Sequence, residues 1–69
     1  MNSLYTLRSV VSFKIYEPRE MSGIGTIIGI RLLINEDSLT YYEYLVQVGD
    51  LDGIWVDESE IDKRYVEAI

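Results

Sequence analysis

The side chains with the most evident chemical potential in this sequence are carboxylates in the second half of the chain. Residues 50–53, with sequence Asp-Leu-Asp-Gly, carry two carboxylates separated by one residue, and Asp57 and Glu58 follow shortly after. Alternating oxygen ligands are typical of calcium-binding loops, which also require a glycine at the sixth position and a glutamate at the twelfth. Here the glycine stands at the fourth position, so the segment is predicted to be a tight turn that binds no metal.

The rest of the sequence offers no recognisable site for catalysis or for a cofactor. It contains no histidine and no cysteine, which removes the commonest general base and any thiolate nucleophile. A carboxylate pair could act as acid and base only in a cleft that separates the two pKa values, and a chain of 69 residues is not expected to form one. The glycines Gly23, Gly25 and Gly29 precede a strand pattern, whereas a phosphate-binding loop requires a helix. We therefore predict no enzymatic activity and no cofactor.

The distribution of charge indicates a kind of partner. The net charge is −6, and no lysine or arginine occurs between Glu36 and Asp62. Such a surface repels phosphate, so direct nucleic-acid binding is not expected, and it attracts a basic protein or peptide. The same acids would also keep a small tyrosine-rich sheet soluble and monomeric, and the sequence leaves both interpretations open.

The elements that must position these groups are predicted to be strands. Apolar and polar residues alternate from Val11 to Ile15, which places Val11, Phe13 and Ile15 on an inward face. Pro18 ends this strand because proline cannot donate a ladder hydrogen bond, and residues 17–25 are predicted to form a loop.

Residues 25–34 form the longest apolar run, and their isoleucines and glycines favour a strand over a helix. Gly29 is the expected position of a bend or bulge. Simple alternation places Thr26, Ile28 and Ile30 together on one face.

The third predicted strand, residues 41–48, alternates clearly, and its uncharged face is assigned to the interior. That inward face consists of Tyr42, Tyr44, Val46 and Val48.

Shorter elements complete the pattern. Residues 49–53 are predicted to be a hairpin loop with glycine at both ends, and residues 54–57 the next strand. A single 3-10 turn over residues 57–61 would tuck Ile61 under the sheet, and residues 63–66 would form the closing strand. Residues 1–9 show no clear period and are predicted to be an arm or an edge strand.

Three segments in a fixed order, Gly23–Ile27, Tyr44–Val46 and Trp55–Glu58, resemble the pattern of small SH3-like barrels, a group that includes KOW and Tudor modules. The resemblance covers residues 11–66. It implies a single domain (residues 1–69) with an all-β fold, namely a strongly bent, five-stranded antiparallel barrel with a short 3-10 turn before the last strand. It implies no particular function. The chain departs from nucleic-acid-binding KOW modules in being acidic, and it lacks the aromatic pair near the first strand of proline-motif-binding SH3 domains.

Trp55, the largest side chain, is predicted to fill the core with one edge exposed. Contacts with a partner are then assigned to the remaining aromatic, leucine and acidic side chains, because the first two supply buried area and the acids steer a basic protein. The predicted contact residues are Tyr41, Glu43, Leu45, Asp50, Asp52, Asp57 and Glu58.

The sequence thus predicts a non-catalytic protein-interaction module that binds a basic protein or peptide. Two alternatives stay open. One is a small acidic inhibitor, encoded by a phage or mobile element, that mimics nucleic acid. The other is a structural subunit that assembles as a homo-oligomer, in the simplest case a homodimer. Because there is no apolar run of membrane-spanning length and no signal-peptide pattern, a cytoplasmic protein without membrane contact is expected.

Overall fold

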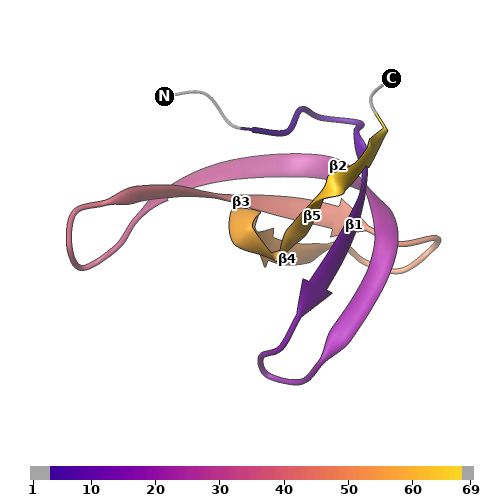
Figure 1. Cartoon of the computed structure of the whole chain (residues 1–69), viewed down its shortest axis with the longest axis horizontal. Coiled ribbons are helices and arrows are strands. Elements are labelled where there is room, and N and C mark those ends of the chain that lie inside the picture. The colour runs from indigo at the N-terminus through magenta and orange to yellow at the C-terminus, as the bar shows by residue number, and fades with distance from the viewer. Residues whose placement is uncertain (1–3, 68–69) are drawn as a thin grey trace.

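The computed structural model describes residues 4–67 of the chain, with side-chain detail for residues 4–64. Five strands form one antiparallel sheet in the order β4-β3-β2-β1-β5 (Figure 1), which confirms the predicted all-β class. Within the described residues there is no α-helix. In this part of the chain the edge strands β4 and β5 do not pair, so the sheet formed by residues 10–67 is not closed. The elements are β1 (Val10–Ile15), β2 (Met21–Ile34), β3 (Thr40–Gln47), β4 (Ile54–Asp57), the 3-10 turn η1 (Glu58–Glu60) and β5 (Ile61–Glu67).

The first hairpin agrees with the alternation in its sequence. β1 pairs with β2 from Val10 opposite Thr26 to Ile15 opposite Met21. The loop predicted for residues 17–25 is therefore shorter than expected, because pairing with β1 draws the chain into β2 at Met21. The inward residues predicted for β1 are all buried: Val11, Phe13 and Ile15.

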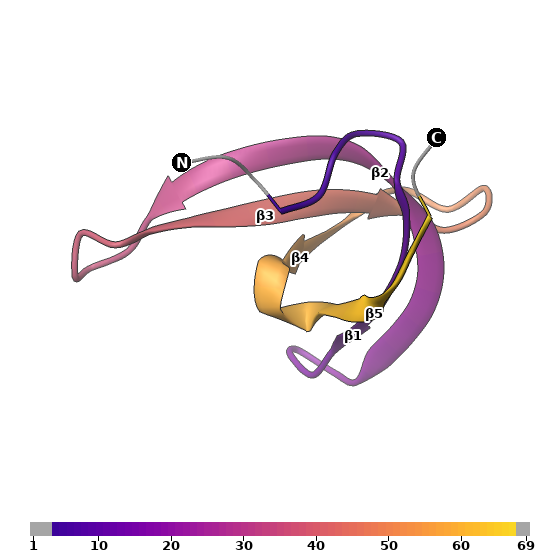
Figure 2. The same ribbon diagram turned by 45° about the horizontal axis from the view of Figure 1, so that its top comes forward.

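The longest strand, β2, connects the two halves of the sheet. Residues 21–26 pair with β1 and residues 26–34 pair with β3, and the ribbon curves strongly between these parts (Figure 2). The pairing with β3 shifts register between Ile27 and Gly29, which confirms the bulge predicted near Gly29. Because a bulge bends a strand and increases its twist, one strand can serve both halves of the sheet.

The bulge also changes the faces that simple alternation assigns to β2. Ile27 is fully buried, and Ile30, three residues later, packs against the same core. Ile28 is 46% exposed. The prediction that Ile28 and Ile30 share a face is therefore wrong, because the extra residue shifts the alternation by one.

The core lies on the concave side of the bent sheet. The inward face predicted for residues 41–48 is confirmed, since Tyr44 and Val46 are fully buried and the other two inward residues pack partly buried beside them. Tyr44 is the largest of the fully buried side chains. The core residues are Tyr5, Val11, Phe13, Ile15, Ile27, Tyr44, Val46, Val56 and Ile61.

Residues 4–9 form no strand, and residues 1–3 of the predicted arm lie outside the described residues. The segment is held against the sheet by two backbone hydrogen bonds, from Arg8 N–H to Ile27 O at 2.8 Å and from Ile27 N–H to Ser9 O at 2.9 Å. Tyr5 is buried, and its ring meets that of Tyr44 edge to face, with centroids 5.4 Å apart. The segment thus behaves as an arm whose aromatic side chain covers one end of the core.

A carboxylate joins this arm to η1. The hydroxyl of Tyr44 donates to Oε2 of Glu58 at 2.5 Å, and the backbone N–H of Leu4 approaches the same oxygen at 3.4 Å. Burial raises the pKa of the Tyr5 hydroxyl above its usual value of about 10, and the carboxylates of Glu58 and Asp62 raise this pKa further.

Alkaline pH is therefore expected to destabilise the fold through Tyr5. In the unfolded chain Tyr5 has its ordinary pKa, so the unfolded state loses this proton at a lower pH than the folded state. The stabilisation is complete below about pH 10 and is lost as the pH rises through the higher folded pKa. In urea titrations at alkaline pH, Tyr5→Phe should reduce the dependence of the unfolding free energy on pH. The exposed Tyr16 is the matched control, and equal slopes for Tyr5→Phe and Tyr16→Phe would contradict this assignment.

The 3-10 turn η1 occurs where the sequence predicts it. The carboxylate of Asp57 accepts a hydrogen bond from Ser59 N–H at 2.9 Å, and the carboxylate of Glu60 accepts one from Asp57 N–H at 2.7 Å. This reciprocal pair is a capping box. Beyond the turn, Ile61 is buried as predicted.

Candidate functional site

The face of β2, β3 and β4 that points away from the core, here called the outer face, carries most of the side chains that could meet a partner. Strand pairing determines which residues are neighbours on it, because residues opposite one another in adjacent strands point to the same side. Two rows cross all three strands: Arg31, Glu43 and Asp57 form one, and Gly29, Leu45 and Trp55 form the next.

Trp55 lies on the outer face and is 39% exposed, so the prediction that it fills the core is wrong. Its neighbour Val56 is fully buried, and alternation along β4 then directs Trp55 outward. The large aromatic side chains of the core are instead Tyr5, Phe13 and Tyr44.

Arg31 is held between the indole ring and a carboxylate. Its guanidinium carbon lies 4.0 Å from the centroid of the Trp55 ring. Its Nε and Nη2 donate to Oε1 of Glu43 at 2.8 and 2.6 Å. An exposed ion pair of this kind contributes little to stability, but it fixes a cation over one side of the ring.

Two glycines allow the apolar side chains of the outer face to lie close to the sheet. A Cβ atom at Gly29 would stand 3.2 Å from Cβ of Leu45 and 3.7 Å from the ring of Trp55. A Cβ atom at Gly53 would stand 2.6 Å from Cδ1 of Leu45. Because both positions are glycine, the side chains of Leu45 and Trp55 can lie close to the strand backbones. These two side chains form a flat apolar patch, here called the platform.

Carboxylates lie on the two strands that carry the platform and in the turn between these strands. Glu43 and Asp57 occupy the adjacent row, and the exposed Asp50 and Asp52 lie in the turn that leads from β3 into β4. Arg31 is the only basic residue in the two rows, and its charge is offset by Glu43. The platform and its border therefore carry a net negative charge, which attracts cationic groups.

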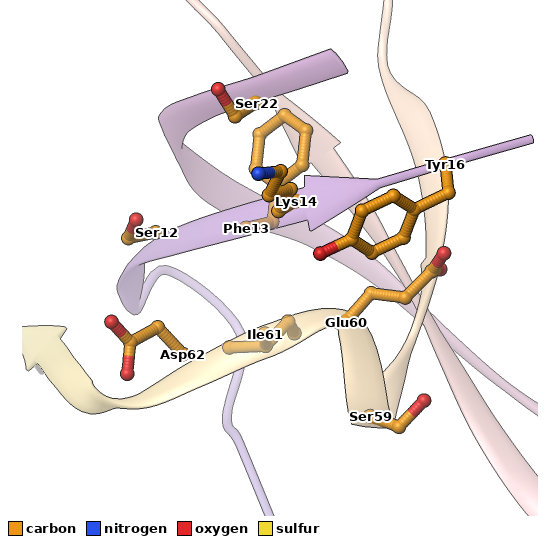
Figure 3. Close-up of a pocket in the computed structure, with 9 residues that line it drawn as sticks. All are labelled: Ser12, Phe13, Lys14, Tyr16, Ser22, Ser59, Glu60, Ile61 and Asp62. Atoms are coloured by element: carbon orange, nitrogen blue, oxygen red, sulfur yellow. The ribbon is translucent and has the colours of Figure 1, made fainter. Parts of the chain in front are cut away.

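A shallow cavity of about 610 Å³ lies elsewhere, between the first hairpin and η1 (Figure 3). Lys14 is engaged with its own neighbours there: its Nζ is 3.3 Å from Oε1 of Glu20 and 5.4 Å from the centroid of the Tyr16 ring. None of the predicted contact residues lines this cavity. Its lining consists of Ser12, Phe13, Lys14, Tyr16, Ser22, Ser59, Glu60, Ile61 and Asp62.

The two acids of the cavity also have partners within the chain. Glu60 completes the capping box with Asp57. Asp62 accepts hydrogen bonds from the backbone N–H of Arg64 at 2.9 Å and from its Nε at 3.2 Å, and these bonds lower the pKa of Asp62. The charged side chains of the cavity are thus each paired within the chain.

Within residues 4–67 no group of three or more histidine, cysteine, aspartate or glutamate side chains is arranged to hold a metal ion. The same part of the chain contains no helix that is long and apolar enough to span a membrane.

Comparison of the chain with protein-family models, with curated protein sequences and with solved structures finds no match. The candidate site therefore rests on the geometry of this chain alone.

The structure brings together most of the predicted contact residues. Four of them lie on the outer face, namely Tyr41, Glu43, Leu45 and Asp57, while Asp50 and Asp52 lie in the turn between β3 and β4. Glu58 does not join this group, because its carboxylate accepts the hydroxyl hydrogen bond of Tyr44.

Sequence reasoning missed three members of the outer face: Arg31, Leu33 and Trp55. For Trp55 a signal was present, since alternation in the short strand Ile54–Asp57 places it on the same side as Asp57. Arg31 and Leu33 could not be assigned in this way, because the bulge before them resets the alternation of β2.

Proposed function

We propose that this chain is a protein-interaction domain that binds a basic protein or peptide on the outer face of β2, β3 and β4. The observation that carries the proposal is the partly exposed Trp55, packed beside Leu45 and bordered by carboxylates. Tryptophan is enriched among the residues that dominate interface energies. The surrounding acids would orient a basic partner and accelerate its association.

The proposed scaffold is an SH3-like barrel that stays open between its edge strands, related in the broad sense to KOW and Tudor modules. Three features support it: the strong bend in β2, the strand order, and the placement of η1 between β4 and β5. We propose further that the domain is non-catalytic and cytoplasmic, and that its partner is neither a nucleic acid nor a membrane. The lack of histidine and cysteine and the charge of −6 support this part of the proposal.

Selection from a display library of short random peptides tests the function. Peptides enriched on the immobilised chain should carry a net positive charge, and their binding should weaken as salt is added, because the attraction is between exposed charges. Enrichment of acidic or uncharged peptides, or binding that does not respond to salt, would show that the proposal is wrong.

Trp55→Ala is expected to weaken the binding of the enriched peptides by about tenfold or more, because truncation of a residue that dominates an interface costs about 2 kcal/mol or more and tryptophan is enriched among such residues. Fluorescence anisotropy of a labelled peptide measures this change. Tyr16→Ala is the matched control, because Tyr16 is an exposed aromatic residue that lines the cavity. If Tyr16→Ala weakened binding and Trp55→Ala did not, the cavity and not the outer face would be the contact site.

A further inference from the structure

The strand that carries Trp55 is an edge of the sheet. Among the described strands, β4 has one neighbour, β3. An edge strand presents backbone N–H and C=O groups that can pair with another extended chain. Which residues of β4 present these groups depends on the phase of the hydrogen bonds between β3 and β4.

The capping box shows in which direction the backbone groups of alternate β4 residues point. The N–H of Asp57 donates to the side chain of Glu60 at 2.7 Å, so this N–H points away from Glu43, its opposite residue on β3. In an antiparallel pair, hydrogen-bonded and non-hydrogen-bonded residues alternate along each strand. Trp55, two residues before Asp57, must have the same orientation.

The hairpin of β2 and β3 supplies a second determination. The N–H of Asn35 donates to the carbonyl of Leu39 at 3.0 Å. Because hydrogen-bonded pairs alternate along the two strands from this pair, the backbone N–H and C=O groups of Glu43 and Leu45 point toward β2. The intervening Tyr44 therefore bonds toward β4, to its opposite residue Val56.

Both determinations agree. The N–H and C=O of Trp55 point together to the open edge of β4, directly beside the outer face. On one side of this position the Asp57 N–H is already used by η1, and on the other lies Gly53, which has no side chain to obstruct an approaching strand.

We propose that the basic partner binds as an additional β-strand along the edge of β4, with one of its residues exchanging both backbone hydrogen bonds with Trp55. This mode rests on the proposed function and adds to it the conformation and register of the bound peptide. Side chains of the added strand that point to the same side as Trp55 lie beside the outer face, and those that alternate with them lie on the side of Ile54.

The charges near the edge select a basic strand. Asp57 lies at one end of β4, and Asp50 and Asp52 lie in the turn at the other end. Lysine or arginine at alternate positions of the added strand would face these carboxylates. A second copy of this chain is disfavoured at the same edge, because antiparallel pairing about Trp55 would place Asp52 of one copy opposite Glu58 of the other.

N-methylated peptides test this mode, because a methyl group on a backbone nitrogen removes the hydrogen-bond donor and leaves the side chain unchanged. The probe is a labelled octapeptide that alternates lysine and valine, titrated with the full chain at low salt and followed by anisotropy. If the lysine side chains lie on the same side as Trp55, the lysine N–H groups point at the edge of β4, where one of them pairs with Trp55, and the valine N–H groups point away from β4. Methylation of the two central lysines should therefore weaken binding by about tenfold or more, while methylation of the two central valines should leave it nearly unchanged.

The emission of Trp55, the only tryptophan of the chain, is a second readout and should change when the unmethylated peptide binds. If both methylated peptides bound as well as their parent and Trp55→Ala still weakened all three, the outer face would be a binding site and strand addition would be refuted. Absence of binding by the parent peptide would refute strand addition as well. A concentration-dependent dimer that is observed by sedimentation and is not dissociated by the peptide would also refute strand addition by a basic partner.

Discussion

Replacing Tyr44 by alanine is expected to unfold the domain at 25 °C. Tyr44 is fully buried, packs edge to face on Tyr5 and binds Glu58 through its hydroxyl. Truncation of a buried aromatic side chain costs about 3–5 kcal/mol, and a single core in a chain of this size seldom supplies more than about the same amount. Circular dichroism of Tyr44→Ala should therefore show the spectrum of an unfolded chain before any denaturant is added.

Two variants separate the contributions of the ring and the hydroxyl. Tyr44→Phe keeps the packing and loses the bond to Glu58, so it should fold with a lower urea midpoint. Tyr42→Ala removes a tyrosine from the same face of the same strand, but from the partly buried margin of the core, and it should also fold. If Tyr42→Ala and Tyr44→Ala had equal midpoints, the central position assigned to Tyr44 would be wrong.

Gly25→Ala is expected to lower the free energy of unfolding by about 1–3 kcal/mol, although alanine is only one methyl group larger. A Cβ atom at Gly25 would stand 2.5 Å from the backbone oxygen of Gln47 and 2.7 Å from Cγ1 of Val46. A backbone oxygen cannot rotate aside as a side chain can, so β2 and β3 would have to separate where β2 bends. Urea denaturation followed by Trp55 fluorescence measures the loss.

Gly23 lies on the same strand and is the matched control. A Cβ atom there would meet the ring of Phe13 at 3.6 Å, an ordinary contact distance. Gly23→Ala should leave stability within about 0.5 kcal/mol of wild type or raise it slightly, because alanine restricts the unfolded chain. Equal losses for Gly23→Ala and Gly25→Ala would indicate a general preference for glycine in β2 and not a collision with β3.

Local patterns in the sequence were sufficient to predict much of the fold. Alternation in residues 11–15 and 41–48 identified two strands and their inward faces, and residues 57–61 indicated the 3-10 turn η1. Gly29 indicated the bulge. Each of these signals depends on residues within a few positions of one another.

The errors concern interactions between segments that are distant in sequence. The size of Trp55 favours the core, but Val56 and its opposite residue Tyr44 take the inward positions where β3 pairs with β4, and the local alternation of β4 outweighs size. The position of the bulge in β2 was predicted, yet its effect on the later faces of that strand was not. The covering role of Tyr5 gave no periodic signal, because the segment around it is irregular.

The contact of the arm with η1 also constrains when the domain can fold during synthesis. This contact joins Leu4 to Glu58, which are 54 residues apart in the chain. In the sheet, β5 is the second neighbour of β1. The hairpin of β1 and β2 can form as soon as both strands have left the ribosome. The pairing of β1 with β5 and the contact of the arm with η1 must wait for residues made later, since long-range pairing of this kind is slow and cannot begin until both partners are present. During that interval the edge of β1 that later pairs with β5 is open to other nascent chains. The run of acids from Glu36 onward emerges before β5 is complete, and the repulsion between the acids of neighbouring chains would protect that edge from aggregation.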